Sequence, residues 1–211
     1  MFLIETIDNA FQLISLGVLT ILSLYQAFKT RKRIWAILTM FYSVMTLGEL
    51  YWLLYMILYA KTPYYSFIPD FCWISAFLFL ILLLLHIRNE RKTWKDHRNS
   101  WLIPVFTIGM ALFYMQWGEY VTNFIYAIFM TPLLFYSLSG MKSAGEKAGR
   151  IDLCSICFCY CVIEYTLWTV SCFFDKGIFF ESLYYASDVA LTIVFILLYP
   201  ATRKVAEDEL Y

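Results

Sequence analysis

The chain has 211 residues, of which 62% are apolar, 20% are aromatic and 15% are charged, and its formal net charge is zero. Soluble domains are usually about half apolar and about a quarter charged. The apolar residues here are gathered in long runs, as membrane-spanning helices require. The composition therefore excludes an ordinary soluble domain. The zero net charge gives no indication of a nucleic-acid partner, and no motif predicts a cofactor.

Seven windows of the sequence are apolar and long enough to cross a bilayer, at about 20 residues for each span. The expected fold class is all-α, namely a polytopic, seven-transmembrane helix bundle in which residues 1–211 form a single transmembrane domain. The fourth window is the shortest of the seven. The predicted spans are residues 10–28, 34–59, 67–87, 101–117, 119–140, 153–174 and 179–201.

The basic residues predict the orientation. All but two of the 16 Lys and Arg residues follow the first, third, fifth or seventh span, so they fall on one side of the membrane. Only Lys61 and Lys176 fall on the other side. Because loops rich in Lys and Arg stay in the cytoplasm, the N-terminus is expected outside and the C-terminus inside. The predicted localisation is the plasma membrane, with the lipid bilayer as the first partner.

Spans two and three resemble spans six and seven. Glu49 lies mid-helix and is followed by Trp52, a short loop and Asp70, whereas Glu164 is followed by Trp168, a short loop and Glu181. Two parallel three-helix repeats joined by the fourth helix would explain this pattern. A bundle without internal symmetry remains the alternative.

Several carboxylates lie inside the predicted spans, where an ionised group costs about 2.5–3.5 kcal/mol at the helix centre. Glu49, Glu164 and Asp188 are mid-helix; Asp70, Glu119 and Glu181 are nearer the outer ends. Helical spacing puts most of them on a face with aromatic residues. The candidate ligand-binding residues are Glu49, Trp52, Asp70, Trp73, Glu164, Trp168, Tyr184, Tyr185 and Asp188.

If these faces converge, they form an outward-facing pocket lined by carboxylates and aromatic rings. Such a pocket suits a small cation with an apolar body, because charge attraction and cation–π contact add. The alternative is that protonated acids serve packing and that the Trp and Tyr residues belong to the membrane interface. A zinc enzyme is disfavoured, because the chain has only two His.

A group of residues in the second and third spans forms a recurring pattern: Gly48-Glu49, Trp52, Tyr55, Pro69-Asp70 and Trp73. It resembles the multi-span N-terminal membrane sensor modules of bacterial signalling proteins, which precede cyclase or kinase domains. The resemblance implies sensing. Because the chain ends at Tyr211 without such a domain, a separate cytoplasmic signalling partner is expected to carry the output. The 3+1+3 plan also resembles SWEET transporters and the KDEL receptor, by topology only.

Three functions remain open at this point. The first is binding or sensing of a small molecule that arrives from the outer side. The second is transport of a small solute, coupled or not to protons, because each half of the predicted repeat carries a mid-membrane acid. The third is a lysoplasmalogenase-like, lipid-active enzyme that uses Asp188 or Glu164 as its acid/base. Enzymatic activity is the least favoured of the three.

Overall fold

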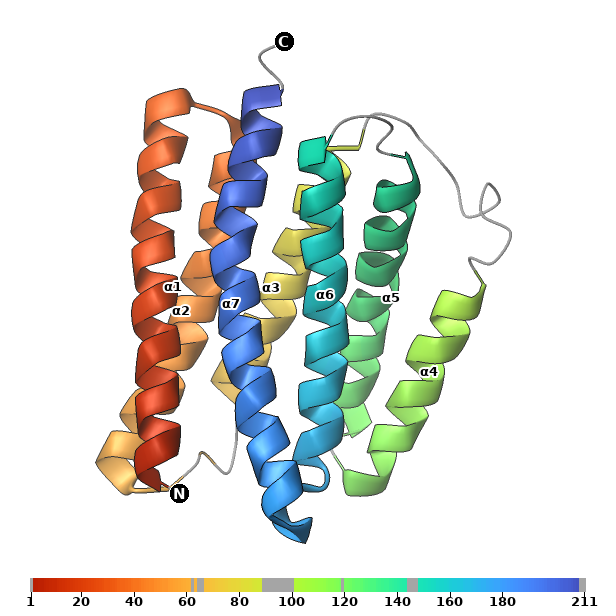
Figure 1. The fold of residues 1–211 in the computed structure, drawn as a ribbon. Helices are drawn as coiled ribbons and strands as arrows, with labels where there is room; N and C mark the ends of the chain where they lie inside the picture. Colours follow the sequence, from red (N-terminus) through yellow and green to blue (C-terminus); the bar gives the residue numbers. More distant parts are fainter. Residues whose placement is uncertain are drawn as a thin grey trace.

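The computed structural model describes residues 2–61, 63, 67–88, 101–118, 120–143 and 148–208. Within these residues, seven α-helices run along roughly one axis (Figure 1). The predicted all-α fold is therefore confirmed. The helices are α1 (Phe2–Thr30), α2 (Arg33–Tyr59), α3 (Phe67–His86), α4 (Leu102–Tyr114), α5 (Tyr120–Ser143), α6 (Ala148–Ser171) and α7 (Ile178–Asp208), with short 3-10 helices η2 (Met115–Trp117) and η3 (Phe174–Lys176) after α4 and α6.

Six of these helices are long and apolar enough to cross a membrane: α1, α2, α3, α5, α6 and α7. The region of the predicted fourth span forms a shorter apolar helix, α4 together with η2, over Leu102–Trp117. The prediction of several membrane-spanning helices is confirmed, and the segment expected to be shortest is the one that falls below the length of a full span.

Three helices differ from the predicted spans by five or more residues at one end. Helix α1 begins at Phe2 rather than at residue 10, and α7 continues to Asp208 rather than stopping at residue 201. Helix α6 covers Ala148–Ser171 instead of residues 153–174. Hydropathy windows stop at the first charged residues, whereas backbone hydrogen bonds continue beyond them. At its end α6 gives way to η3, and the chain then turns at Gly177 with φ +144°.

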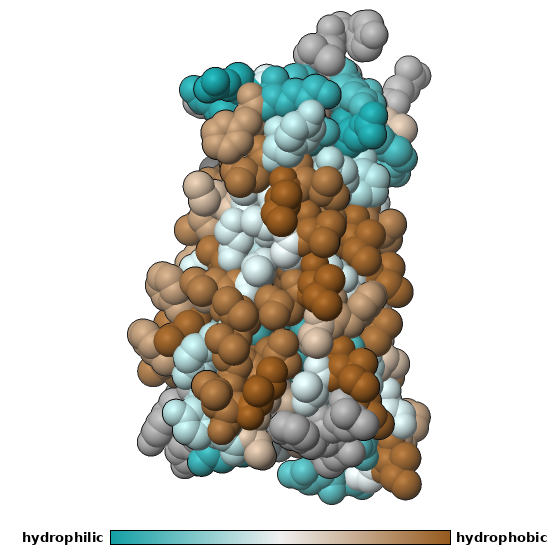
Figure 2. Space-filling view, turned by 90° about the vertical axis from the view of Figure 1, so that its left-hand side faces the viewer, coloured by the Kyte–Doolittle hydropathy of each residue, from teal (hydrophilic) through white to brown (hydrophobic). Residues whose placement is uncertain are grey.

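Helix α1 has its apolar face on the outside of the bundle. Residues such as Ile7, Ile14 and Ile21 are at least 60% exposed, whereas Asn9 and Gln12 are buried. A soluble helix would show the reverse arrangement. Figure 2 shows the same side of the molecule with a wide hydrophobic zone and hydrophilic residues gathered at the end that carries the C-terminus. The outer surface of α1 is therefore suited to lipid.

The six long helices form a closed ring. Neighbours pack in the order α1, α2, α3, α5, α6 and α7, and α7 packs back against α1. Helix α4 lies outside this ring and packs against α5 (Figure 1). The ring therefore encloses one interior, to which α4 contributes little.

The middle of this interior is closed by a group of aromatic side chains, which we call the aromatic plug. Its members come from α2, α3, α6 and α7, and their ring centroids lie about 5–6 Å apart. The hydroxyl of Tyr42 donates a hydrogen bond of 2.7 Å to the backbone carbonyl of Phe195. The aromatic plug consists of Phe41, Tyr42, Phe77, Tyr160 and Phe195, all of which are fully buried.

The described basic residues lie mainly at one end of the bundle, where α1, α3, α5 and α7 end. At this end Lys204 of α7 forms an ion pair of 2.6 Å with Asp152 of α6. The predicted basic residues 91–98 and Lys147 lie outside the described residues. The two ends of the bundle therefore differ in charge, and the opposite end carries the start of α1.

Candidate functional site

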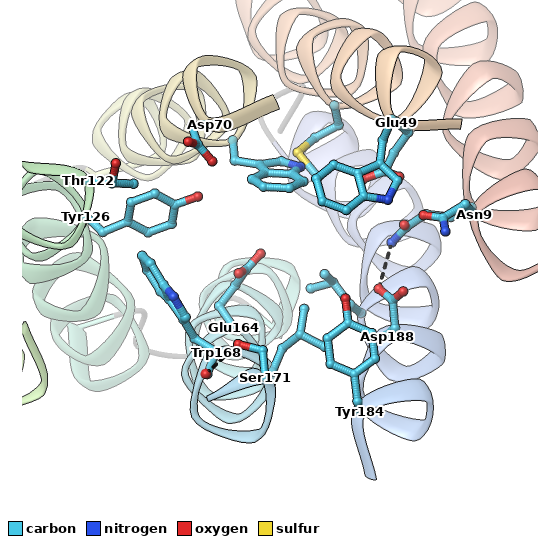
Figure 3. A pocket seen from close by; sticks show the side chains of 16 residues that line it. Asn9, Glu49, Asp70, Thr122, Tyr126, Glu164, Trp168, Ser171, Tyr184 and Asp188 are labelled. Atoms are coloured by element: carbon cyan, nitrogen blue, oxygen red, sulfur yellow. Dashed lines mark hydrogen bonds between the residues drawn. The ribbon is translucent and has the colours of Figure 1, made fainter. Parts of the chain in front are cut away.

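A cavity of about 290 Å³ lies inside the ring, at the end that carries the start of α1. Figure 3 shows side chains from all six ring helices pointing into it. Helix α1 contributes Asn9 and Gln12, α2 contributes Met45, Glu49 and Trp52, α3 contributes Asp70 and Trp73, α5 contributes Thr122 and Tyr126, α6 contributes Glu164, Leu167, Trp168 and Ser171, and α7 contributes Tyr184, Asp188 and Leu191.

The structure brings eight of the nine candidate residues together around this cavity. Tyr185 is the exception, because it is absent from the lining and its ring instead lies against those of Tyr184 and Phe174. Among the outer acids, Glu181 does not line the cavity either, and Glu119 lies outside the described residues.

Four carboxylates reach the cavity from four different helices. Glu49 of α2 is only 5% exposed, and Trp73 is hydrogen-bonded to its side chain. Asp70, Glu164 and Asp188 are half-buried. No Lys, Arg or His occurs among the described residues that line the cavity. The described lining of this space is therefore acidic and contains no basic side chain.

Aromatic rings form much of the remaining wall. Trp52 and Trp73 lie with ring centroids 5.9 Å apart, and Tyr126 meets Trp168 edge-on at 4.0 Å. Tyr114 of α4 stacks on Trp168 at 5.3 Å, and its hydroxyl lies 2.8 Å from that of Thr169. Tyr114 therefore holds α4 against α6 and braces the cavity wall at Trp168.

Helical spacing explains why these residues share the cavity. Glu164, Trp168 and Ser171 are separated by four and three residues on α6, and the cavity residues of α7 follow the same spacing. Side chains at such intervals lie on one face of a helix. Between α2 and α3, Gly48 permits close approach, because a Cβ there would lie 3.1 Å from that of Cys72. This contact lies beside Glu49 and Trp73 in the wall.

Several cavity residues escaped the sequence analysis. Asn9 and Gln12 are 8% and 3% exposed, and Gln12 Nε2 donates a hydrogen bond of 3.4 Å to Asp188 Oδ1. The sequence could have indicated both, because two polar residues three apart at the start of an apolar run predict an inward-facing stripe. Tyr126 had no comparable signal, since it is one of 17 tyrosines in the chain.

The carboxylates do not form a metal-binding cluster. Within the part of the chain that the structure describes, no group of three or more His, Cys, Asp or Glu side chains is placed to hold a metal ion. The fold and the cavity define the chain as a polytopic membrane protein with an acidic and aromatic cavity inside its helix ring. Comparisons with protein-family models, curated proteins and solved structures found no match.

Proposed function

We propose that this chain binds or senses a small organic cation, which enters the cavity from the outer side of the plasma membrane. The observation that carries the proposal is the combination of three carboxylates, Glu49, Glu164 and Asp188, with no basic residue in the described lining. Buried charges in proteins are normally paired, because leaving them unpaired away from water costs several kcal/mol. A bound cation would supply the missing positive charge.

The aromatic walls favour an organic cation over a bare metal ion. Trp faces attract cations by about 0.5–2 kcal/mol, and Trp52, Trp73 and Trp168 all line the cavity. Pockets for drug-sized ligands usually measure about 300–1,000 Å³. A cavity of about 290 Å³ therefore suits a small molecule, such as an amine or a quaternary ammonium ion with a compact apolar group.

The direction of approach follows from charge and topology. Lys and Arg residues of the inner loops are expected to face the cytoplasm. The cavity lies at the other end of the bundle, near the start of α1. The chain is proposed to cross the bilayer seven times, because α3 and α5 begin at the same end of the bundle and α4 returns the chain between them. The N-terminus is then outside.

The ring order also supports the proposed pair of three-helix repeats. The middle helices α2 and α6 each pack between two neighbours of their own unit, and the units meet at α3 with α5 and at α7 with α1. Glu49 and Glu164, the matching acids of the two middle helices, both line the cavity. Glu181, the predicted counterpart of Asp70, does not, so the match is limited to the middle helices.

The proposal predicts that purified protein binds benzyltrimethylammonium, a permanent cation with one aromatic ring. We expect the cation to raise the unfolding temperature, because a ligand that binds only the native state stabilises it. The uncharged isostere neopentylbenzene controls for partition into detergent and should give no shift. Equal shifts with both compounds, or no shift with the cation or with a panel of primary amines, would overturn the proposal.

A transporter is the second candidate, and the repeat-like arrangement of Glu49 and Glu164 favours it. Against a continuous path stands the aromatic plug, whose side chains are fully buried beyond the cavity. We therefore expect no uptake of labelled benzyltrimethylammonium by proteoliposomes beyond that of protein-free vesicles. Saturable uptake that unlabelled cation inhibits would show that the protein is a transporter rather than a binding protein or sensor. If the protein is a sensor, a cytoplasmic partner carries the output.

A further inference from the structure

Two carboxyl groups are hydrogen-bonded to each other at the edge of the cavity. Asp8 of α1 and Asp188 of α7 form a side-chain hydrogen bond across the junction of the two helices. Gln12, one turn after Asp8, donates a further bond of 3.4 Å to Asp188 Oδ1. An ionised carboxylate has no proton to donate. The pair can therefore form this bond only while it holds at least one proton.

The described titratable side chains that face this pair are carboxyl and phenol groups. Glu49 of α2 and Glu164 of α6 approach Asp188 from across the cavity. Glu5 of α1 and the α7 residues Glu181, Tyr184 and Tyr185 lie around the same junction. None of these side chains is basic. Like-charged carboxylates close together cannot all ionise without a cation or a proton between them.

We propose that a cation entering the cavity replaces the proton shared by Asp8 and Asp188, so that binding and proton release are one exchange. This inference rests on the proposed cation binding. In the exchange the O–H bond of the protonated carboxyl breaks, the proton leaves to water, and the bond between the two carboxyls is lost. The bound cation balances the second negative charge. No electron is transferred.

The exchange fixes the sign of the pH dependence. At low pH the pair is protonated and the cation must displace the proton, so binding is weak. As the pH rises, the competing proton becomes scarce and the apparent affinity increases by up to about tenfold for each pH unit, the value for one linked proton. Above the pH at which the pair loses its proton, the affinity becomes constant.

The test is titration calorimetry of the full chain with benzyltrimethylammonium, in two buffers of the same pH and different ionisation enthalpy. The probe carries no titratable proton, so any released proton comes from the protein. We expect about one proton released for each cation bound. Binding without proton release would overturn the exchange and leave the proposed function standing, whereas no binding in either buffer would overturn the proposed function itself.

The variant Asp8→Asn locates the proton. The Asn amide can donate to an ionised Asp188, so we expect binding to persist with no proton release and a flat pH profile. Glu5→Gln removes a neighbouring acid of α1 that does not line the cavity, and should release protons as the wild type does. Release retained in Asp8→Asn would overturn the assignment. If that variant fails to fold, the wild-type calorimetry still decides the exchange.

Discussion

Replacing Glu164 by Gln is expected to weaken binding of benzyltrimethylammonium by about 30-fold or more. Removing one partner of a desolvated charge pair typically costs about 2–5 kcal/mol, and 2 kcal/mol corresponds to roughly 30-fold in Kd. Gln keeps nearly the same shape and removes the negative charge. Glu164 lines the cavity opposite Glu49 and Asp188, so its charge is expected to attract a cation bound anywhere between these three side chains.

The same substitution should not destabilise the unliganded protein. Removing one of several like charges from a cavity whose described lining holds no basic residue relieves repulsion, so the unfolding temperature is expected to stay the same or rise. Calorimetry for Kd and thermal unfolding without ligand test the two parts separately. The matched control is Glu181→Gln, which removes an acid of α7 outside the cavity lining and should bind as the wild type does.

Two results would contradict this interpretation. A wild-type Kd in Glu164→Gln would mean that the acid serves packing. A large fall in the unfolding temperature of the unliganded variant would mean that the carboxylate is needed for the fold rather than for a ligand.

The sequence could predict the helices and the acidic face because both depend on local periodicity. A helix repeats every 3.6 residues, so residues four apart share a face. This holds for Glu164 with Trp168 and for Tyr184 with Asp188. The cost of a charge in lipid then indicated that these faces turn inward. Neither inference needed to know which helices are neighbours.

The remaining cavity residues depend on tertiary packing. Tyr126 reaches the cavity because α5 joins the ring between α3 and α6, while α4 lies outside. Nothing in the sequence around Tyr126 encodes that order. Tyr185 was predicted from helical spacing, since it lies four residues after Glu181 and three before Asp188. Consecutive residues on a helix point about 100° apart, and of the two neighbouring tyrosines only Tyr184 faces the cavity.

The two ends of the bundle differ in packing as well as in charge. Towards the N-terminal end, the interior is a cavity with acids; in the middle, it is the fully buried aromatic plug. Tyr42 and Tyr160 lie before Glu49 and Glu164 on α2 and α6, on the side of the basic end. The plug therefore lies between the cavity and the basic end, and its Phe77 packs against Tyr126 of the cavity wall.

Replacing Phe77 of the aromatic plug by Ala is expected to destabilise the protein by about 3–5 kcal/mol, the usual cost of removing a buried phenyl ring. Phe77 is fully buried, and its ring lies 5.0 Å from that of Tyr126 and 5.9 Å from that of Tyr160. Both edge-on contacts would be lost, and a void would remain between α3, α5 and α6. Thermal or denaturant unfolding in detergent measures the change.

The control for Phe77→Ala is Phe71→Ala on the same helix. Phe71 is 65% exposed on the outer surface, so its loss should leave the unfolding free energy nearly unchanged. Because Tyr126 lines the cavity and rests on Phe77, the plug variant should also bind benzyltrimethylammonium more weakly than Phe71→Ala does. Equal stability of the two variants would show that the aromatic plug is not tightly packed. The cavity would then lack the rigid wall on which selective cation binding depends.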